Sequence, residues 1–342
     1  MTSEIVPQER RLKFVKPQRE WKWEIAIYLY LAGMGAGAFI IGMVVQWLGL
    51  SLRPSTAFTL FGYPVDLSRA AFLWGPILVA IGAPFLILDL GIKRRFLYAC
   101  LNPRTSWVAR GFLILSTFIV LGLAMFGRSL LPAGSLGGRT TLWILVEMIS
   151  VIFAFATAIY TGVLLKSVKY VPIWNTPLLP SLFLVSALST GSMLTILSAL
   201  GYGLVFAGGE SLGLIHKLIG AEQILILIEA IVLAVYLLTK YRVRDQGETS
   251  VRLLLSGELK FLFWGGIVLI GFIFPVLLEF LYSHFPRSPG LLIVTGLSLL
   301  AGGFFLRLGV LASGVKEQLP MHKYVEMKVQ LSTPQRSISP GQ

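Results

Sequence analysis

The sequence predicts an all-α polytopic membrane protein with eight transmembrane helices arranged as two four-helix bundles. Hydrophobic residues make up 56% of the 342 residues and charged residues only 13%, whereas a soluble domain carries roughly 25% charged residues. The mean hydropathy of the chain is +0.80. The apolar residues gather in eight stretches, each long enough for the about 20 residues that a helix needs to cross a bilayer. An ordinary soluble enzyme is therefore excluded.

The eight expected spans follow one another with polar segments between them. They are Glu24–Leu50, Ala70–Leu90, Ala109–Gly127, Leu142–Lys166, Thr176–Val205, Lys217–Lys240, Leu259–Leu281 and Leu291–Gly314. Pro76 and Pro84 lie inside the second span, where neighbouring helices can satisfy the freed carbonyl groups, so we expect a kink rather than a break. A basic tail is expected over residues 1–23 and a polar tail over 317–342. The membrane domain between them, 24–316, divides into bundles at 24–166 and 176–316.

Small residues and basic loops recur in the two halves of the membrane domain. Gly33 and Gly37 are four residues apart in the first span, and small residues at this spacing let a neighbouring helix approach closely. The segment from Ser186 to Ser192 offers the same in the fifth span. A basic loop precedes both the third and the seventh spans. This weak repeat favours two related groups of four helices.

The charge distribution predicts the orientation in the membrane. Of the 29 Lys and Arg residues, 22 lie in segments on the side of the N-terminal tail and six on the other side, while Arg307 lies inside the last span. The positive-inside rule then places both termini in the cytoplasm. The basic side could instead receive an acidic protein partner, which leaves the opposite orientation open. The tail to residue 23 contains no apolar stretch of the kind found in a signal peptide.

Cysteine and histidine residues are scarce. An iron–sulfur cluster needs about four cysteine ligands, and Cys100 is the single cysteine of the chain. The histidines are His216, His284 and His322, and we expect none of them at mid-membrane depth, where a haem held by two histidines would need them. We therefore expect no haem, no iron–sulfur cluster and no metal site in this chain.

Four parts of the chain have distinctive motifs. They are Trp21–Tyr28 with Tyr30–Gly37, Leu88–Phe96 with Leu101–Trp107, Ile159–Leu165 with Val171–Asn175 and Leu179–Gly191, and Ala301–Arg307 with Ala312–Gly314. Together they resemble the NrfD/polysulfide reductase membrane-subunit family. The resemblance implies a quinone-reactive anchor in a prokaryotic cell membrane. It also implies two partners, a ferredoxin-like iron–sulfur subunit and a catalytic subunit that is often a molybdopterin enzyme. Electrons would pass between the clusters and menaquinone or ubiquinone, and we expect no nucleic acid as a partner.

Polar residues at the ends of three spans form the candidate quinone site. They are Glu24 and Tyr28 in the first span, Asp89 at the end of the second and Tyr160 near the end of the fourth, below a loop with the candidate docking residues Arg95 and Arg104. Quinone chemistry needs hydrogen-bond partners and a proton donor from the protein. By motif position, Tyr28 and Tyr160 match the quinone ligands of the family. Some relatives have a histidine in place of Tyr28, so Glu24 or Asp89 is the alternative proton donor.

Each of these residues also has an ordinary structural interpretation. Tyrosines are enriched at membrane interfaces as anchors, which would explain Tyr28 and Tyr160. Glu24 could be a first-turn acid that interacts with the helix dipole. Asp89 could form an ion pair with Arg94 or Arg95.

Four charged residues inside the spans suggest a proton path. They are Glu147, Glu222, Glu229 and Arg307, and charges at membrane depth are costly and usually functional or paired. Glu222 and Glu229 share a helix face, and Glu229 and Arg307 are a candidate pair. The alternative is a buried salt bridge that fixes helix register. Glu279, His216 and His284 are expected near the far surface as solvated helix ends, and His322 in the exposed tail.

The sequence thus predicts a membrane anchor and quinone-binding subunit of a respiratory oxidoreductase complex, with proton transfer as an added role. Two other functions stay open. A secondary transporter of a small anion would have its cavity at the bilayer midplane, whereas the polar layer found here lies near one surface. A structural anchor without an active quinone site would have the same partners.

Overall fold

The computed structural model describes residues 21, 23–49, 58–60, 63–65, 70–88, 104, 106–129, 140–206, 211–243, 246–284 and 288–316. The elements are mainly helices. They are α2 (Trp23–Trp47), β1 (Phe58–Leu60), β2 (Tyr63–Val65), α3 (Ala70–Leu88), α5 (Trp107–Ser129), α6 (Thr141–Lys166), α7 (Leu178–Phe206), α8 (Ser211–Arg242), α9 (Gln246–Leu255), η3 (Leu262–Ile273), α10 (Phe274–His284) and α11 (Pro289–Ala312). The two short strands pair as an antiparallel hairpin.

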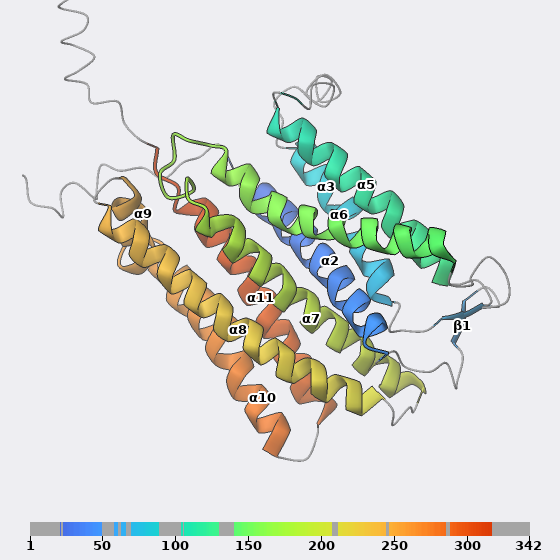
Figure 1. The fold of residues 1–342 in the computed structure, drawn as a ribbon. Helices are drawn as coiled ribbons and strands as arrows, with labels where there is room; N and C mark the ends of the chain where they lie inside the picture. Colours follow the sequence, from blue (N-terminus) through green and yellow to red (C-terminus); the bar gives the residue numbers. More distant parts are fainter. Residues whose placement is uncertain are drawn as a thin grey trace, which may run out of the picture.

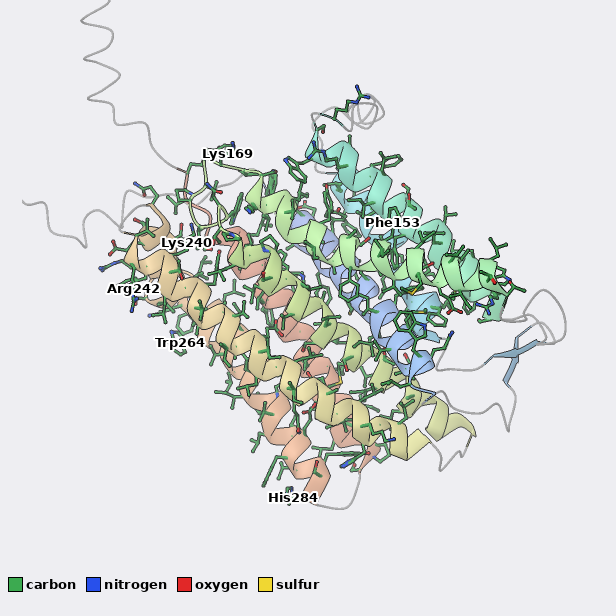
Figure 2. All side chains as sticks on the ribbon, in the orientation of Figure 1. Phe153, Lys169, Lys240, Arg242, Trp264 and His284 are labelled. Carbon is green, nitrogen blue, oxygen red and sulfur yellow. The ribbon has the colours of Figure 1, made fainter. Side chains whose placement is uncertain are left out.

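The long helices run side by side and alternate in direction, as Figure 1 shows. Lys169, Lys240 and Arg242 lie at one end of the bundle and His284 at the opposite end (Figure 2). We call these the basic end and the far end. The Trp21 ring stacks on Trp174 with 5.4 Å between centroids, and the Trp174 indole N–H donates to the Val310 carbonyl at 2.8 Å. The start of α2 and the end of α11 therefore lie together at the basic end.

Helix α2 is the centre of the packing. It contacts α3 and α6 of the first half of the chain and α7 and α11 of the second half, and α6 also contacts α7 directly. Glycines at alternate positions of α2 let the neighbouring helices approach this closely. A Cβ atom at Gly37 would overlap the Ala187 carbonyl of α7, and a Cβ atom at Gly35 would lie 2.7 Å from the Gly75 carbonyl of α3. The close helix contact predicted for Gly37 is confirmed.

Seven helices within the described residues are long and apolar enough to cross a membrane, with η3 and α10 counting as one continuous helix over Leu262–His284. They occupy the positions of seven of the eight expected spans. At the position of the second expected span lies α3, whose apolar part, Ala71–Leu86, is shorter. The helical membrane architecture is thus present. The structure adds the β1–β2 hairpin and the short helix α9, which the sequence analysis did not predict.

The segment between α6 and α7 is fixed by hydrogen bonds to its backbone from the second half of the chain. The Tyr236 hydroxyl donates to the Ile173 carbonyl at 2.9 Å, and the Lys240 ammonium donates to the Asn175 carbonyl at 3.1 Å. This connection joins the two halves at the basic end, close to the polar residues at the ends of α2 and α6.

Candidate functional site

Two polar side-chain atoms on the first turns of α2 are buried without a hydrogen-bond partner. Tyr28 has no exposed surface, and its hydroxyl makes no hydrogen bond to any described residue. The carboxylate oxygen Oε2 of Glu24 is also buried and makes no hydrogen bond to any described residue. The two residues are four apart, so they share a face of the helix. Buried polar atoms without partners are rare in native proteins, and these two leave hydrogen-bonding capacity for a ligand.

Tyr160 approaches this face from α6. It is only 3% exposed and lies close enough to Tyr28 for the two side chains to interact electrostatically. Its hydroxyl donates to the Trp107 carbonyl at the start of α5, at 3.1 Å. A Cβ atom at Gly111 would overlap the Tyr160 ring, so a glycine at this position makes room for the tyrosine. The burial of both tyrosines differs from that of a lipid-facing anchor, whose ring would be exposed.

The start of α5 connects Tyr160 to exposed basic residues. The Arg110 guanidinium lies 4.5 Å from the centre of the Trp107 ring and donates to the Arg104 carbonyl at 2.8 Å. Arg104 is exposed, as a docking residue must be. Asp89 and Arg95 lie outside the described residues.

A second polar group runs through the interior between α7, α8 and α11. The Ser189 hydroxyl donates to Glu222 Oε1 at 3.2 Å. Glu229 lies about two turns further along α8 and interacts with both Ser189 and Ser186. Arg307 of α11 donates to the Ser186 hydroxyl at 2.9 Å. All of these side chains are at most 5% exposed. We call Glu222, Ser189, Glu229, Ser186 and Arg307 the interior polar chain.

Arg307 closes this chain toward α2. It also donates to the Gly303 carbonyl at 3.0 Å, and its guanidinium carbon lies 5.5 Å from the centre of the Tyr30 ring and 5.4 Å from that of Phe183. No ion pair joins Arg307 to Glu229 in the part of the chain that the structure describes. Ser186 lies between them and contacts both, so their attraction acts through a bridging hydroxyl rather than through direct contact.

Glu147 lies apart from the interior polar chain. Its Oε1 atom is 2.6 Å from an Arg128 guanidinium nitrogen and 3.4 Å from the Gln46 amide nitrogen. These contacts tie the far ends of α6, α5 and α2 together. Among the described residues, no hydrogen bond or ion pair links Glu147 to Glu222, Glu229 or Arg307, so the structure does not bring the four predicted residues together.

The surroundings of Glu279 differ from the sequence prediction. We expected a solvated helix end, but Glu279 has no exposed surface and lies beside Glu222 and Gln223. It lies one and a half turns before the end of α10, where α8 still covers it. His216 and His284 are exposed as predicted.

The sequence analysis also missed the polar role of Ser186 and Ser189, which it assigned to helix packing. Their three-residue spacing places them on one face of α7. That face meets Glu222 and Glu229. These two acids are seven residues apart and so lie on one face of α8, which was the signal in the sequence for a polar partner face.

A family model and several known proteins are similar to this chain. The family described as "Polysulphide reductase, NrfD" matches residues 12–317. The C subunit of the polysulfide reductase of Wolinella succinogenes is 30% identical over 313 residues, covering 86% of this protein and 94% of that one. Protein NrfD of Escherichia coli K12 is 26% identical, covering 86% and 94%, and the NrfD homolog of Haemophilus influenzae is 24% identical, covering 88% and 96%. The chain belongs to the polysulphide reductase NrfD family.

Proposed function

We propose that this chain is the membrane anchor and quinone-binding subunit of a respiratory oxidoreductase complex. In this role it exchanges electrons between a ferredoxin-like iron–sulfur subunit and the membrane quinone pool. Family membership supports the coarser role of a membrane subunit in an oxidoreductase system. The observation that carries the quinone site is the pair of buried, unpartnered polar atoms on α2, Tyr28 Oη and Glu24 Oε2.

The polar atoms of this site fit a ligand with carbonyl oxygens. Reduction of a quinone to a quinol takes two electrons and two protons. The Tyr28 hydroxyl is available to donate a hydrogen bond to a carbonyl oxygen. Glu24 is placed to hold the proton, with Asp89 as the second candidate. The Trp107 carbonyl positions the Tyr160 hydroxyl beside Tyr28.

Partner docking belongs at the same end of the bundle. Arg104 is exposed a few residues before Trp107, whose carbonyl contacts Tyr160, and we assign it and Arg95 to the docking surface. An iron–sulfur subunit bound there would place its cluster close to the site. The catalytic subunit, of the molybdopterin type or another, would bind to that partner and supply the substrate chemistry.

The interior polar chain is the proposed proton path. Hydroxyl and carboxyl groups from Glu222 to Arg307 follow one another through the apolar interior, and such groups within a membrane usually mark ion or proton pathways. Glu147 fits this role less well, because Arg128 and Gln46 already satisfy its Oε1 atom.

We further propose that α3 is an eighth crossing, so that the membrane domain forms two four-helix bundles with both termini in the cytoplasm of a prokaryotic cell. The support is geometric. Since α2 begins and α11 ends at the same end of the bundle, the number of crossings must be even. A phosphatase that is active only after export, fused to the C-terminus, should stay inactive. Activity there would reverse the orientation.

Substitution of Tyr160 by Phe tests the quinone site. Tyr160→Phe should slow quinone turnover in the purified complex and leave its assembly intact, and Asp89→Asn should do the same. Tyr236→Phe is the matched control, because Tyr236 also donates from a buried hydroxyl to a backbone carbonyl but lies on α8. Equal turnover in Tyr160→Phe, Asp89→Asn and Tyr236→Phe complexes would exclude this site.

Mass spectrometry of the proteins that co-purify in mild detergent tests the partners. A cysteine-rich ferredoxin-like subunit would support the electron-transfer role. A folded chain that purifies alone would favour a transporter.

A further inference from the structure

Glu222 of α8 and Glu279 of α10 lie close enough for their carboxyl groups to interact directly. Neither residue has any exposed surface. Oε2 of Glu222 and both carboxylate oxygens of Glu279 have no hydrogen-bond partner among the described residues. Two ionised carboxylates cannot donate a hydrogen bond to each other, so this arrangement is incomplete unless something lies between them.

The charges around this pair do not neutralise it. Ser189 of α7 donates one hydrogen bond to Glu222, and Gln223 of α8 lies next to Glu279. Among the described residues, the other charged group that acts on Glu222 is Glu229 of α8, which is also acidic, and Arg307 of α11 interacts with Glu229. Arg307 donates its hydrogen bonds to Ser186 and Gly303 rather than to the pair. Two adjacent negative charges in a site of low dielectric repel strongly, and paired carboxyl groups in such sites share a proton.

We propose that Glu222 and Glu279 hold one proton between them, with one carboxylic acid donating a hydrogen bond to the carboxylate of the other. A shared proton removes one of the two charges and supplies the donor that the unpartnered oxygens lack. The pair adjoins Ser189 and Glu229, so it extends the interior polar chain toward the far end. Its use as a proton reservoir during turnover rests on the proposed function, whereas the shared proton itself does not.

A metal cation fits this pair less well than a proton. Calcium takes six to eight oxygen ligands and magnesium six. The two carboxylates supply four oxygens, and the Ser189 hydroxyl already donates to one of them. A proton needs only the two facing oxygens.

Chemical labelling of the full-length chain in native membranes tests the proposal. Dicyclohexylcarbodiimide forms a stable adduct with protonated carboxyl groups in apolar surroundings, and peptide mass spectrometry locates it. At neutral pH we expect an adduct on Glu222 or Glu279 but never on both in one chain, and no protection by sodium ions. Labelling only after acidification, labelling of both residues in one chain, or protection by sodium would each overturn the proposal.

Infrared difference spectroscopy gives an answer that does not depend on access of the reagent. The carbonyl stretch of protonated acids should lose the contribution of the pair in the Glu222→Gln/Glu279→Gln double variant. That contribution should persist in Glu229→Gln, a control that removes another buried acid of α8. A band in the double variant as intense as that of the wild type would refute the shared proton.

The proposal can fail independently of the quinone site. Labelling and spectroscopy do not require quinone turnover, and Tyr160→Phe should leave both unchanged. A loss of labelling with normal quinone turnover in the wild-type complex would reject the carboxyl pair alone.

Discussion

The contact between α2 and α7 gives the sharpest prediction about the fold. A Cβ atom at Gly191 of α7 would overlap the backbone of Gly37 and Ala38 in α2. Both helices have glycine at the point of closest approach, and the clashing atoms belong to backbone rather than to flexible side chains. Gly191→Ala must therefore push the two helices apart.

The size of the effect follows from two opposing contributions. Overpacking in a well-packed interior costs about 1–3 kcal/mol, occasionally more. Alanine gains about 1 kcal/mol over glycine in helix propensity. Because backbone atoms cannot rotate away, we expect the upper part of the steric range and a net destabilisation of about 2 kcal/mol. The entropy of unfolding is about 2.1 cal/mol/K per residue, so for a chain of 342 residues this destabilisation lowers the melting temperature by about 3 °C.

The assay is thermal unfolding of the detergent-purified chain, with Gly220→Ala as the control. A Cβ atom at Gly220 of α8 meets nothing within 4 Å, so this variant gains only helix propensity and should match or exceed the wild type. Equal melting temperatures for Gly191→Ala and Gly220→Ala would refute the close contact of α2 with α7.

Two further predictions concern contacts that hold the ends of the bundle. Glu147→Gln leaves the Arg128 guanidinium, whose side chain is 11% exposed, without its counterion, which should cost about 3 kcal/mol. The melting temperature should largely recover when both residues are replaced together by Leu and Met, and a wild-type melt for Glu147→Gln would contradict the pairing. Trp174→Phe removes the indole donor to Val310 and should cost about 1 kcal/mol. The matched variant of the exposed Trp23 should show no change, and equal melts for the two would argue against this hydrogen bond.

Much of the fold follows from local sequence. The order of the spans and the positions of their ends depend on runs of apolar residues, and a lipid bilayer requires every backbone polar group in such a run to be satisfied within a helix. The predicted fourth span, Leu142–Lys166, differs from α6 by a single residue. The close approach at Gly37 was likewise predictable, because the absence of a side chain is itself a local property.

Pairings across the bundle depend on rotation of each helix about its axis, which one sequence does not specify. Glu279 lies near the end of a span, where solvent is the usual surrounding, yet α8 covers it. Glu229 and Arg307 were a candidate pair; they interact electrostatically, with Ser186 lying between them. Glu147 has a charge at membrane depth like Glu222, but its partners come from α5 and α2.

The sequence by itself thus determined the membrane class, the helix positions, the family resemblance and the residue types available for chemistry. The tertiary structure alone decided which of those residues meet, which are buried and which polar atoms are left without partners. The physical reason is that apolar periodicity acts over neighbouring residues, whereas a buried polar contact depends on several helices packed at one depth.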